Sequence, residues 1–129
     1  MLSARIKLWL ERDGSAFFGD GRAALLEAIN ETGSLSQAAK SMKMSYRTAW
    51  ENINQMETAL GRQLVLRQTG GSRGGGCTLT DHAHALLAAY AEFRESLETA
   101  KDQLFRAMLI KVNEQADTPT DTPQPEKKT

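Results

Sequence analysis

The alternation of hydrophobic and polar positions between residues 34 and 61 predicts two helices joined by a short turn. Apolar side chains recur every three or four residues, each series follows a serine that can cap a helix, and a glycine ends the second. The positions are Ser34, Leu35, Ala38, Ala39 and Met42 in the first helix, and Ser45, Ala49, Ile53, Met56, Leu60 and Gly61 in the second.

The second of these helices carries polar side chains opposite its apolar stripe. The face opposite the stripe presents Arg47, Glu51, Asn54 and Thr58. A short helix, a turn and a longer helix with a polar face are typical of a helix-turn-helix, whose second helix can enter the major groove of DNA. An ordinary helical hairpin has the same periodicity, so this stretch alone leaves both interpretations open.

The N-terminal part of the chain changes from a period of two to a helical period. Residues 5–11 alternate between apolar and polar side chains and predict a short, half-buried strand, which residues 13–15 end. Residues 22–32 predict a helix that Gly33 closes, and Asp20 is a candidate for its N-cap.

After the helix pair, two β-prone runs flank a glycine-rich link. Residues 64–69 and 77–80 are the runs, and residues 70–76 are the link, in which Arg73 is the one charged residue. This pattern predicts a β-hairpin, or wing, whose arginine can reach a DNA phosphate or the minor groove. A phosphate-binding loop would need a lysine after the last glycine, and none follows here.

From Thr80 onward the sequence predicts one long helix, over residues 81–113. Its apolar positions repeat at alternating steps of four and three, the spacing of a coiled-coil seam. They are Leu86, Tyr90, Phe93, Leu97, Ala100, Leu104 and Ala107. A helix of this length needs a partner, most simply a second copy of the chain, although Leu86 and Leu87 could instead pack back onto the preceding domain.

The expected fold class is therefore mainly α with a small β-hairpin wing. Residues 1–80 are expected to form a winged helix-turn-helix, residues 81–113 a dimerisation helix, and residues 114–129 a disordered tail, because the tail is polar and proline-rich.

Charge and composition narrow the classes of function. The chain has 16 basic and 16 acidic residues, but residues 40–73 hold six basic residues against two acidic ones, a local excess of four positive charges. Such a local excess fits a nucleic-acid-binding face. The single cysteine, Cys77, cannot form an intrachain disulfide, and the absence of a long apolar run gives no membrane segment, so we expect a cytoplasmic protein.

Three segments resemble a known family. Gly-Ser-Leu-Ser-Gln-Ala-Ala-Lys at 33–40, Met-Ser-Tyr-Arg-Thr-Ala-Trp at 44–50 and Gly-Gly-Ser-Arg-Gly-Gly-Gly-Cys-Thr-Leu-Thr at 70–80 are similar to the N-terminal domain of ModE-type molybdate-responsive regulators. That domain is related to the LysR-type DNA-binding domain. The LysR-type pattern is matched by Ser45, Ile53, Met56, Glu57, Leu60, Gly61, Leu64 and Arg67.

The resemblance implies a homodimeric, sequence-specific transcriptional regulator that binds a palindromic operator in double-stranded DNA. By resemblance, the residues that contact the DNA backbone are Ser34, Ser36 and Gln37. Those that contact the DNA groove are Ser45, Tyr46, Arg47, Thr48 and Trp50, and the wing contributes a contact from Arg73. The dimer interface is expected at Leu86, Tyr90, Phe93, Leu97 and Leu104. Regulators of this type bind molybdate in β-rich domains after the long helix, where this chain has its tail, so we expect no molybdate site in it.

Other classes of function receive less support from the residues. Cys77, His82 and His84 lie close together and suggest a metal- or redox-sensing alternative, although a structural metal site usually needs four ligands. A protein-interaction module that uses the long helix is a second alternative. An enzyme is the least supported class, because the chain has no nucleophile–base pair, carboxylate dyad or cofactor fingerprint.

Overall fold

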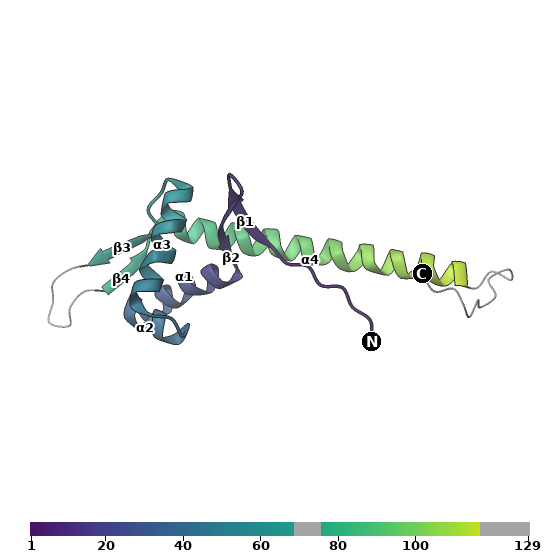
Figure 1. Cartoon of the computed structure of the whole chain (residues 1–129), viewed down its shortest axis with the longest axis horizontal. Coiled ribbons are helices and arrows are strands. Elements are labelled where there is room, and N and C mark those ends of the chain that lie inside the picture. The colour runs from purple at the N-terminus through teal and green to yellow at the C-terminus, as the bar shows by residue number, and fades with distance from the viewer. Residues whose placement is uncertain (69–75, 117–129) are drawn as a thin grey trace. The chain divides into compact units, whose positions relative to one another are not determined.

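A computed structural model describes residues 1–68 and 76–116 of the chain (Figure 1). The chain divides into two compact units, one comprising residues 7–93 and the other residues 1–6 together with the chain from residue 94 onward. The elements are β1 (Trp9–Arg12), β2 (Ser15–Gly19), α1 (Asp20–Thr32), α2 (Leu35–Ser41), α3 (Tyr46–Leu60), β3 (Val65–Gln68), β4 (Gly76–Leu79) and α4 (Asp81–Ala116). The expected fold class, a mainly α winged helix-turn-helix, is confirmed.

The helix ends lie where capping chemistry predicts them. Ser34, Ser45 and Thr80 precede α2, α3 and α4, and the side-chain oxygen of each accepts a hydrogen bond of 3.0–3.1 Å from the backbone N–H three residues later. Gly33 and Gly61 follow α1 and α3 with φ of 67° each, in the left-handed conformation that glycine adopts without a steric penalty. Local sequence therefore fixes the helix-turn-helix.

The N-terminal strand is one half of a hairpin, which corrects the expectation of a single strand over residues 5–11. β1 pairs antiparallel with β2, with Arg12 opposite Ser15. Between them, Asp13 and Gly14 have φ of 51° and 84°, as a two-residue hairpin turn requires. The strand ends in this turn and the chain reverses.

Asp20 does not cap α1, contrary to the expectation from sequence. The N-cap residue of α1 is Gly19, and it makes no side-chain capping hydrogen bond. The Asp20 carboxylate instead accepts a hydrogen bond from the hydroxyl of Tyr90.

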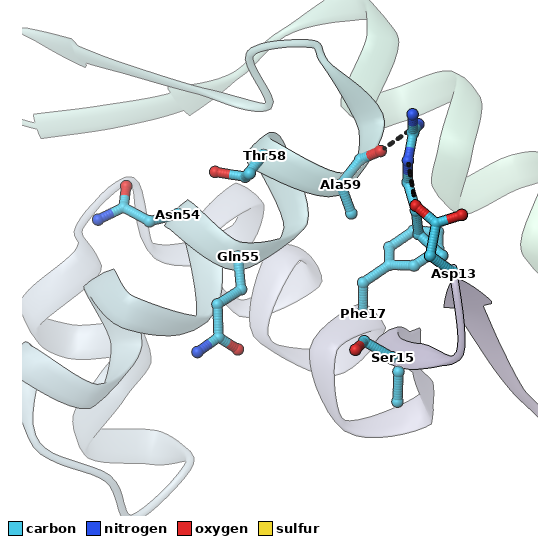
Figure 2. A pocket seen from close by; sticks show the side chains of 9 residues that line it. Asp13, Ser15, Phe17, Asn54, Gln55, Thr58 and Ala59 are labelled. Carbon is cyan, nitrogen blue, oxygen red and sulfur yellow. Dashed lines mark hydrogen bonds and ion pairs between the residues drawn. The ribbon is translucent and has the colours of Figure 1, made fainter.

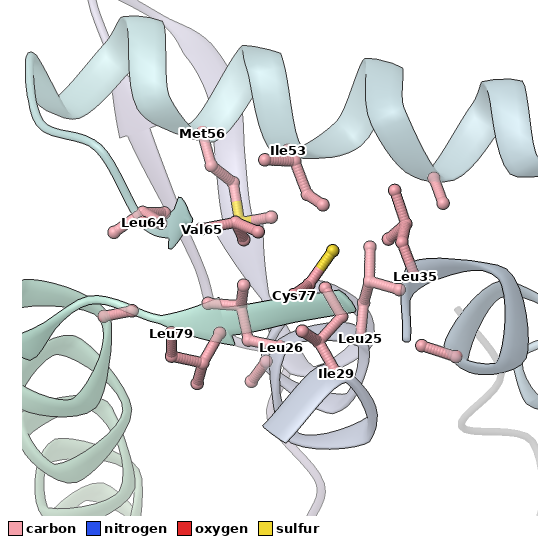
Figure 3. Close-up of a cluster of buried hydrophobic side chains, with 14 of the residues drawn as sticks. Leu25, Leu26, Ile29, Leu35, Ile53, Met56, Leu64, Val65, Cys77 and Leu79 are labelled. Atoms are coloured by element: carbon pink, nitrogen blue, oxygen red, sulfur yellow. The ribbon is translucent and has the colours of Figure 1, made fainter. Parts of the chain in front are cut away.

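One hydrophobic core joins α1, α2, α3 and both wing strands (Figure 3). The largest fully buried side chains are Phe18, Leu25, Leu26, Ile29, Ile53, Met56 and Leu64. Burying each such side chain contributes about 1.5–3 kcal/mol relative to leaving it in water. The apolar stripe of α3 faces this core, so the opposite face of α3 faces solvent.

Each strand of the wing is anchored to the rest of the domain by hydrogen bonds. The Glu57 carboxylate of α3 accepts hydrogen bonds from the backbone N–H groups of Leu64 and Val65, at 2.8 and 3.2 Å, and so fixes the start of β3. The N–H of Cys77 donates to the carbonyl of Gly33 at 2.9 Å, which fixes β4 against the end of α1. The expected wing is confirmed as an antiparallel β3–β4 pair, and Arg73 lies outside the described residues.

The first turns of α4 belong to the same core, which corrects one residue of the expected dimer seam. Tyr90 is only 6% exposed and its ring meets that of Phe18 edge-on, with centroids 4.9 Å apart. Tyr90 is therefore buried within its own chain and cannot pack against a second copy. Leu86 is half-buried against the same core, as the packing alternative expected.

The rest of α4 continues as helix to Ala116, three residues past the expected end at 113. The ammonium of Lys101 donates to the carbonyl of Ala4 at 2.8 Å, so the N-terminal segment contacts this part of the helix at Ala4. Large apolar side chains on α4 are exposed, and they are Phe93, Leu104, Met108, Ile110 and Val112. In the described part of the chain, no helix combines the length and the apolar character that crossing a membrane requires.

Candidate nucleic-acid interface

The N-terminal end of α3 presents three of the predicted DNA-binding side chains to solvent. Tyr46 is 49% exposed, the Arg47 side chain is 89% exposed, and Thr48 is also exposed. The buried residues Ala49 and Ile53 hold the helix against the core on its other side. The N-terminus of a helix also has unpaired N–H groups and a partial positive charge, and both favour an anion such as a phosphate.

Arg47 and Glu51 form an ion pair on this exposed face. Nε of Arg47 lies 3.4 Å from Oε2 of Glu51, one turn along the helix. An exposed pair at this spacing is worth about 0.3–0.5 kcal/mol. The pair is weak enough for Arg47 to leave Glu51 at little cost when a stronger acceptor is present.

Arg67 joins the wing to the N-terminal end of α3. The guanidinium carbon of Arg67, on β3, lies 4.2 Å from the centre of the Trp50 ring, and Nη2 of Arg67 donates to the hydroxyl of Tyr46 at 3.0 Å. The rings of Tyr46 and Trp50 meet edge-on, 6.4 Å apart. Trp50 and Arg67 lower the pKa of the Tyr46 hydroxyl below its ordinary value, because a donor beside the oxygen favours the phenolate.

The residues that are predicted to contact the DNA backbone lie at the N-terminal end of α2. The side-chain oxygen of Ser34 is already used as the helix cap, while Ser36 and Gln37 are exposed. Between α2 and α3, Lys43 has a φ of 58°, which turns the chain so that the two helices follow each other closely. α2 therefore presents its N-terminus and α3 its first turn as exposed polar surfaces.

Two surface pockets flank α3. One, of about 650 Å³, lies between the second half of α3 and the β1–β2 hairpin, where the Arg12 guanidinium donates to the carbonyl of Ala59 at 2.9 Å (Figure 2). The other, of about 510 Å³, lies between α3 and β3, and Trp50, Asn54 and Arg67 are among the residues that line it. Both pockets border the polar face of α3, and Asn54 lines both of them.

The structure brings most of the predicted site together and adds one residue. Tyr46, Arg47, Thr48 and Trp50 share one end of α3, with Ser45 as its cap. Arg67 joins them from β3, although spacing along the sequence gives no sign of a contact between positions 21 residues apart. Its place in the LysR-type pattern was the one signal that marked it.

The metal-sensing alternative gains no ligand set from the structure. Cys77 is buried in the core, and His84 is exposed. Across residues 1–68 and 76–116, no group of three or more His, Cys, Asp and Glu side chains is placed to hold a metal ion.

Part of the chain matches a known protein family. Residues 22–84 match the family described as bacterial regulatory helix-turn-helix protein, lysR family. The matched range runs from α1 through the wing to the first turn of α4, which is the part of the chain that carries the exposed end of α3.

Curated relatives match a longer part of the chain. It is 37% identical over 98 residues to the molybdenum transport protein ModE of Azotobacter vinelandii, a match that covers 76% of this chain and 36% of the relative. It is 35% identical over 108 residues to the transcriptional regulator ModE of Haemophilus influenzae, covering 84% and 41%, and 43% identical over 89 residues to that of Yersinia pestis, covering 69% and 34%. The chain thus spans between 34% and 41% of the length of these three relatives.

A solved structure shares the fold. The chain in the crystal structure of the CbnR DBD–DNA complex matches 67% of this chain and 94% of its own length, with a TM-score of 0.50 and 24% sequence identity. At this identity the match establishes the fold.

Proposed function

We propose that this chain is a DNA-binding transcriptional regulator that acts without catalysis, because residues 22–84 match the family of bacterial regulatory helix-turn-helix proteins described as lysR. One observation carries the proposal: the first turn of α3 exposes Tyr46, Arg47 and Thr48 side by side next to a β-hairpin. This end of the helix has the donors, the exposure and the partial charge that reading a DNA groove requires.

Phosphate contacts set the register of the chain on the duplex. Ser36 and Gln37 are exposed at the N-terminus of α2, where backbone N–H groups can also reach a phosphate. The hydroxyl of Ser34 caps that helix by accepting from the N–H of Gln37, and so holds the start of the helix in place for the contact. Arg73 supplies a further contact from the wing, as its position in the glycine-rich link suggests. These contacts orient the domain and carry no base information.

Base reading falls to the first turn of α3. Arg47 leaves the weak pair with Glu51 and donates two hydrogen bonds to one guanine, an interaction worth about 1–3 kcal/mol of discrimination. Ser45, Tyr46 and Thr48 contact neighbouring edges or phosphates from the same turn. Trp50 is half-buried, so it supports Tyr46 and reaches DNA only with its outer edge.

The proposed regulator is a homodimer that binds a palindromic site. Exposed apolar side chains on α4, such as Phe93 and Leu104, support a helix–helix interface with a second copy, and half-buried Leu97 lies between them in the sequence. A two-fold dimer places two α3 helices in successive major grooves, so half-sites are expected roughly 34–36 Å apart or at a multiple of that distance. A protein of this function acts in the cytoplasm, where it meets DNA.

The proposal is tested by selecting bound sequences from random duplex DNA with the purified chain. We expect a palindromic consensus, and an affinity for it that falls with salt by about 0.9 log units per phosphate contact. If the selection enriches no sequence, and the affinity for DNA does not change with salt, the chain is not a DNA-binding regulator. Self-association without DNA binding would favour the protein-interaction alternative.

A further inference from the structure

Arg67 makes two contacts with α3 from a different element. Its guanidinium lies on the Trp50 ring, 4.2 Å from the centre of that ring, and donates to the Tyr46 hydroxyl at 3.0 Å. Tyr46 and Trp50 are one helical turn apart, so their side chains share one face of α3. A single side chain of the wing therefore holds two aromatic residues at the reading end of the helix.

The backbone that carries Arg67 is fixed relative to α3. The Glu57 carboxylate of α3 accepts hydrogen bonds from the N–H groups of Leu64 and Val65, at the start of the strand to which Arg67 belongs. Within that strand, Arg67 pairs with Cys77 on β4, which is itself tied to the carbonyl of Gly33. Arg67 thus approaches the two aromatic side chains from a rigid base.

We propose that Arg67 is a positioning residue for DNA recognition, which holds Tyr46 and Trp50 in their reading orientation and couples the wing to the first turn of α3. This inference rests on the proposed function. Arginine suits the role because its planar guanidinium can stack on a ring and donate a directed hydrogen bond at the same time, which the ammonium of lysine cannot do.

A direct phosphate contact is the competing role for Arg67. One face of its guanidinium lies on Trp50 and one of its nitrogens donates to Tyr46, so the geometry of the free protein already commits the group to α3. The two roles differ in their consequences. Loss of a positioning residue relaxes sequence preference, whereas loss of a phosphate contact weakens binding to all sequences and lowers the salt slope by about 0.9.

The first test compares Arg67→Lys and Arg67→Ala with Arg62→Ala, which removes an exposed arginine from the turn after α3. Affinities are measured for the selected duplex and for a scrambled duplex over a range of salt. We expect both Arg67 variants to lower the ratio of the two affinities by about two- to fivefold, the value of one cation–π contact. Arg62→Ala is expected to leave that ratio unchanged.

The salt slope separates the two roles. A slope that is unchanged in Arg67→Lys and Arg67→Ala, together with the lower ratio, supports positioning. A ratio that stays at the wild-type value in both variants overturns the proposal. A slope that falls by about 0.9 in Arg67→Ala and is restored in Arg67→Lys, at an unchanged ratio, assigns Arg67 to a phosphate instead.

The second test needs no DNA, so it still applies if the proposed function fails. Ultraviolet titration follows the ionisation of Tyr46 in the folded protein, and Tyr46→Phe identifies which transition belongs to it. We expect Arg67→Ala to raise the pKa of Tyr46 towards its ordinary value, because a donor to the hydroxyl is lost. An unchanged pKa would show that Arg67 does not hold Tyr46 in solution and would overturn the proposal.

Discussion

The hydroxyl of Tyr90 on α4 donates a 2.6 Å hydrogen bond to Oδ1 of Asp20, the first residue of α1. The two residues are 70 positions apart, and the Tyr90 ring also packs edge-on against Phe18. The first turns of α4 are therefore part of the helix-turn-helix core. The large apolar side chains of α4 that stay exposed begin at Phe93.

Tyr90→Phe is expected to reduce the free energy of unfolding by about 1 kcal/mol, the net value of a typical hydrogen bond. The oligomeric state is expected to stay the same, because the side chain is buried within its own chain. Urea denaturation and sedimentation measure the two quantities. Tyr46→Phe, which removes a hydroxyl whose hydrogen bond with Arg67 is exposed to solvent, serves as the control and is expected to change stability by less than about 0.5 kcal/mol. If Tyr90→Phe is monomeric while its free energy of unfolding equals that of the wild type, Tyr90 belongs to the dimer interface.

Glu57→Ala is expected to cost about 1–3 kcal/mol, because it leaves the N–H groups of Leu64 and Val65 without their acceptor. Glu57→Gln keeps one oxygen in place and should recover part of the loss. Glu27→Ala, at an exposed position on α1, is the matched control for removing a carboxylate. The measurement is the midpoint of urea unfolding, and equal midpoints for Glu57→Ala and Glu27→Ala would contradict this role of Glu57.

Lys43→Gly is expected to stabilise the fold by about 0.5–1 kcal/mol. Lys43 has a φ of 58°, where a side chain carries a steric cost that glycine avoids. Lys40→Gly is the control, since it removes the same charge from within α2 and should destabilise by about 1 kcal/mol. Thermal unfolding of the two variants should therefore move in opposite directions, and a shift to lower temperature in both would rule out relief of backbone strain at Lys43.

Leu104→Glu is expected to convert the proposed dimer into a monomer. Leu104 is 71% exposed in the single chain, and a carboxylate there would have to be buried in a helix–helix interface at a high cost. Gln103→Glu adds the same charge at the neighbouring polar position and should leave the dimer intact. Sedimentation equilibrium distinguishes the species, and a Leu104→Glu variant that stays dimeric would place the interface elsewhere.

The helix-turn-helix could be predicted from sequence because its determinants are local. Ser34 and Ser45 cap helices whose apolar residues follow at helical spacing, and glycines end two of the helices. Each of these signals depends on residues within one or two turns of each other, so it does not depend on what the rest of the chain does.

The N-terminal hairpin was missed although its signal was present. Asp13-Gly14 between two short extended runs is the pair that a two-residue hairpin turn favours. The alternation of residues 5–11 predicts a strand that ends here, and it does not by itself predict the second strand. The preference of this pair for positive φ predicts that the chain reverses at this point.

The contacts of Tyr90 and Arg67 depend on tertiary structure, so spacing could not predict them. A coiled-coil period shows that one face of a helix is apolar but leaves open what covers it, and Tyr90 is covered by its own domain. Arg67 reaches Tyr46 and Trp50 only because the hairpin brings β3 beside α3.

If the first turn of α3 reads bases, as proposed, Arg47→Ala should change which base pairs the protein prefers. Affinities of the wild type and the variant are measured for the selected duplex and for every single-base change in one half-site. We predict that the variant loses discrimination at one base pair, by about 1–3 kcal/mol, and keeps it at the other positions. An equal loss of affinity for all sequences, or an unchanged preference at every position, would contradict the claim.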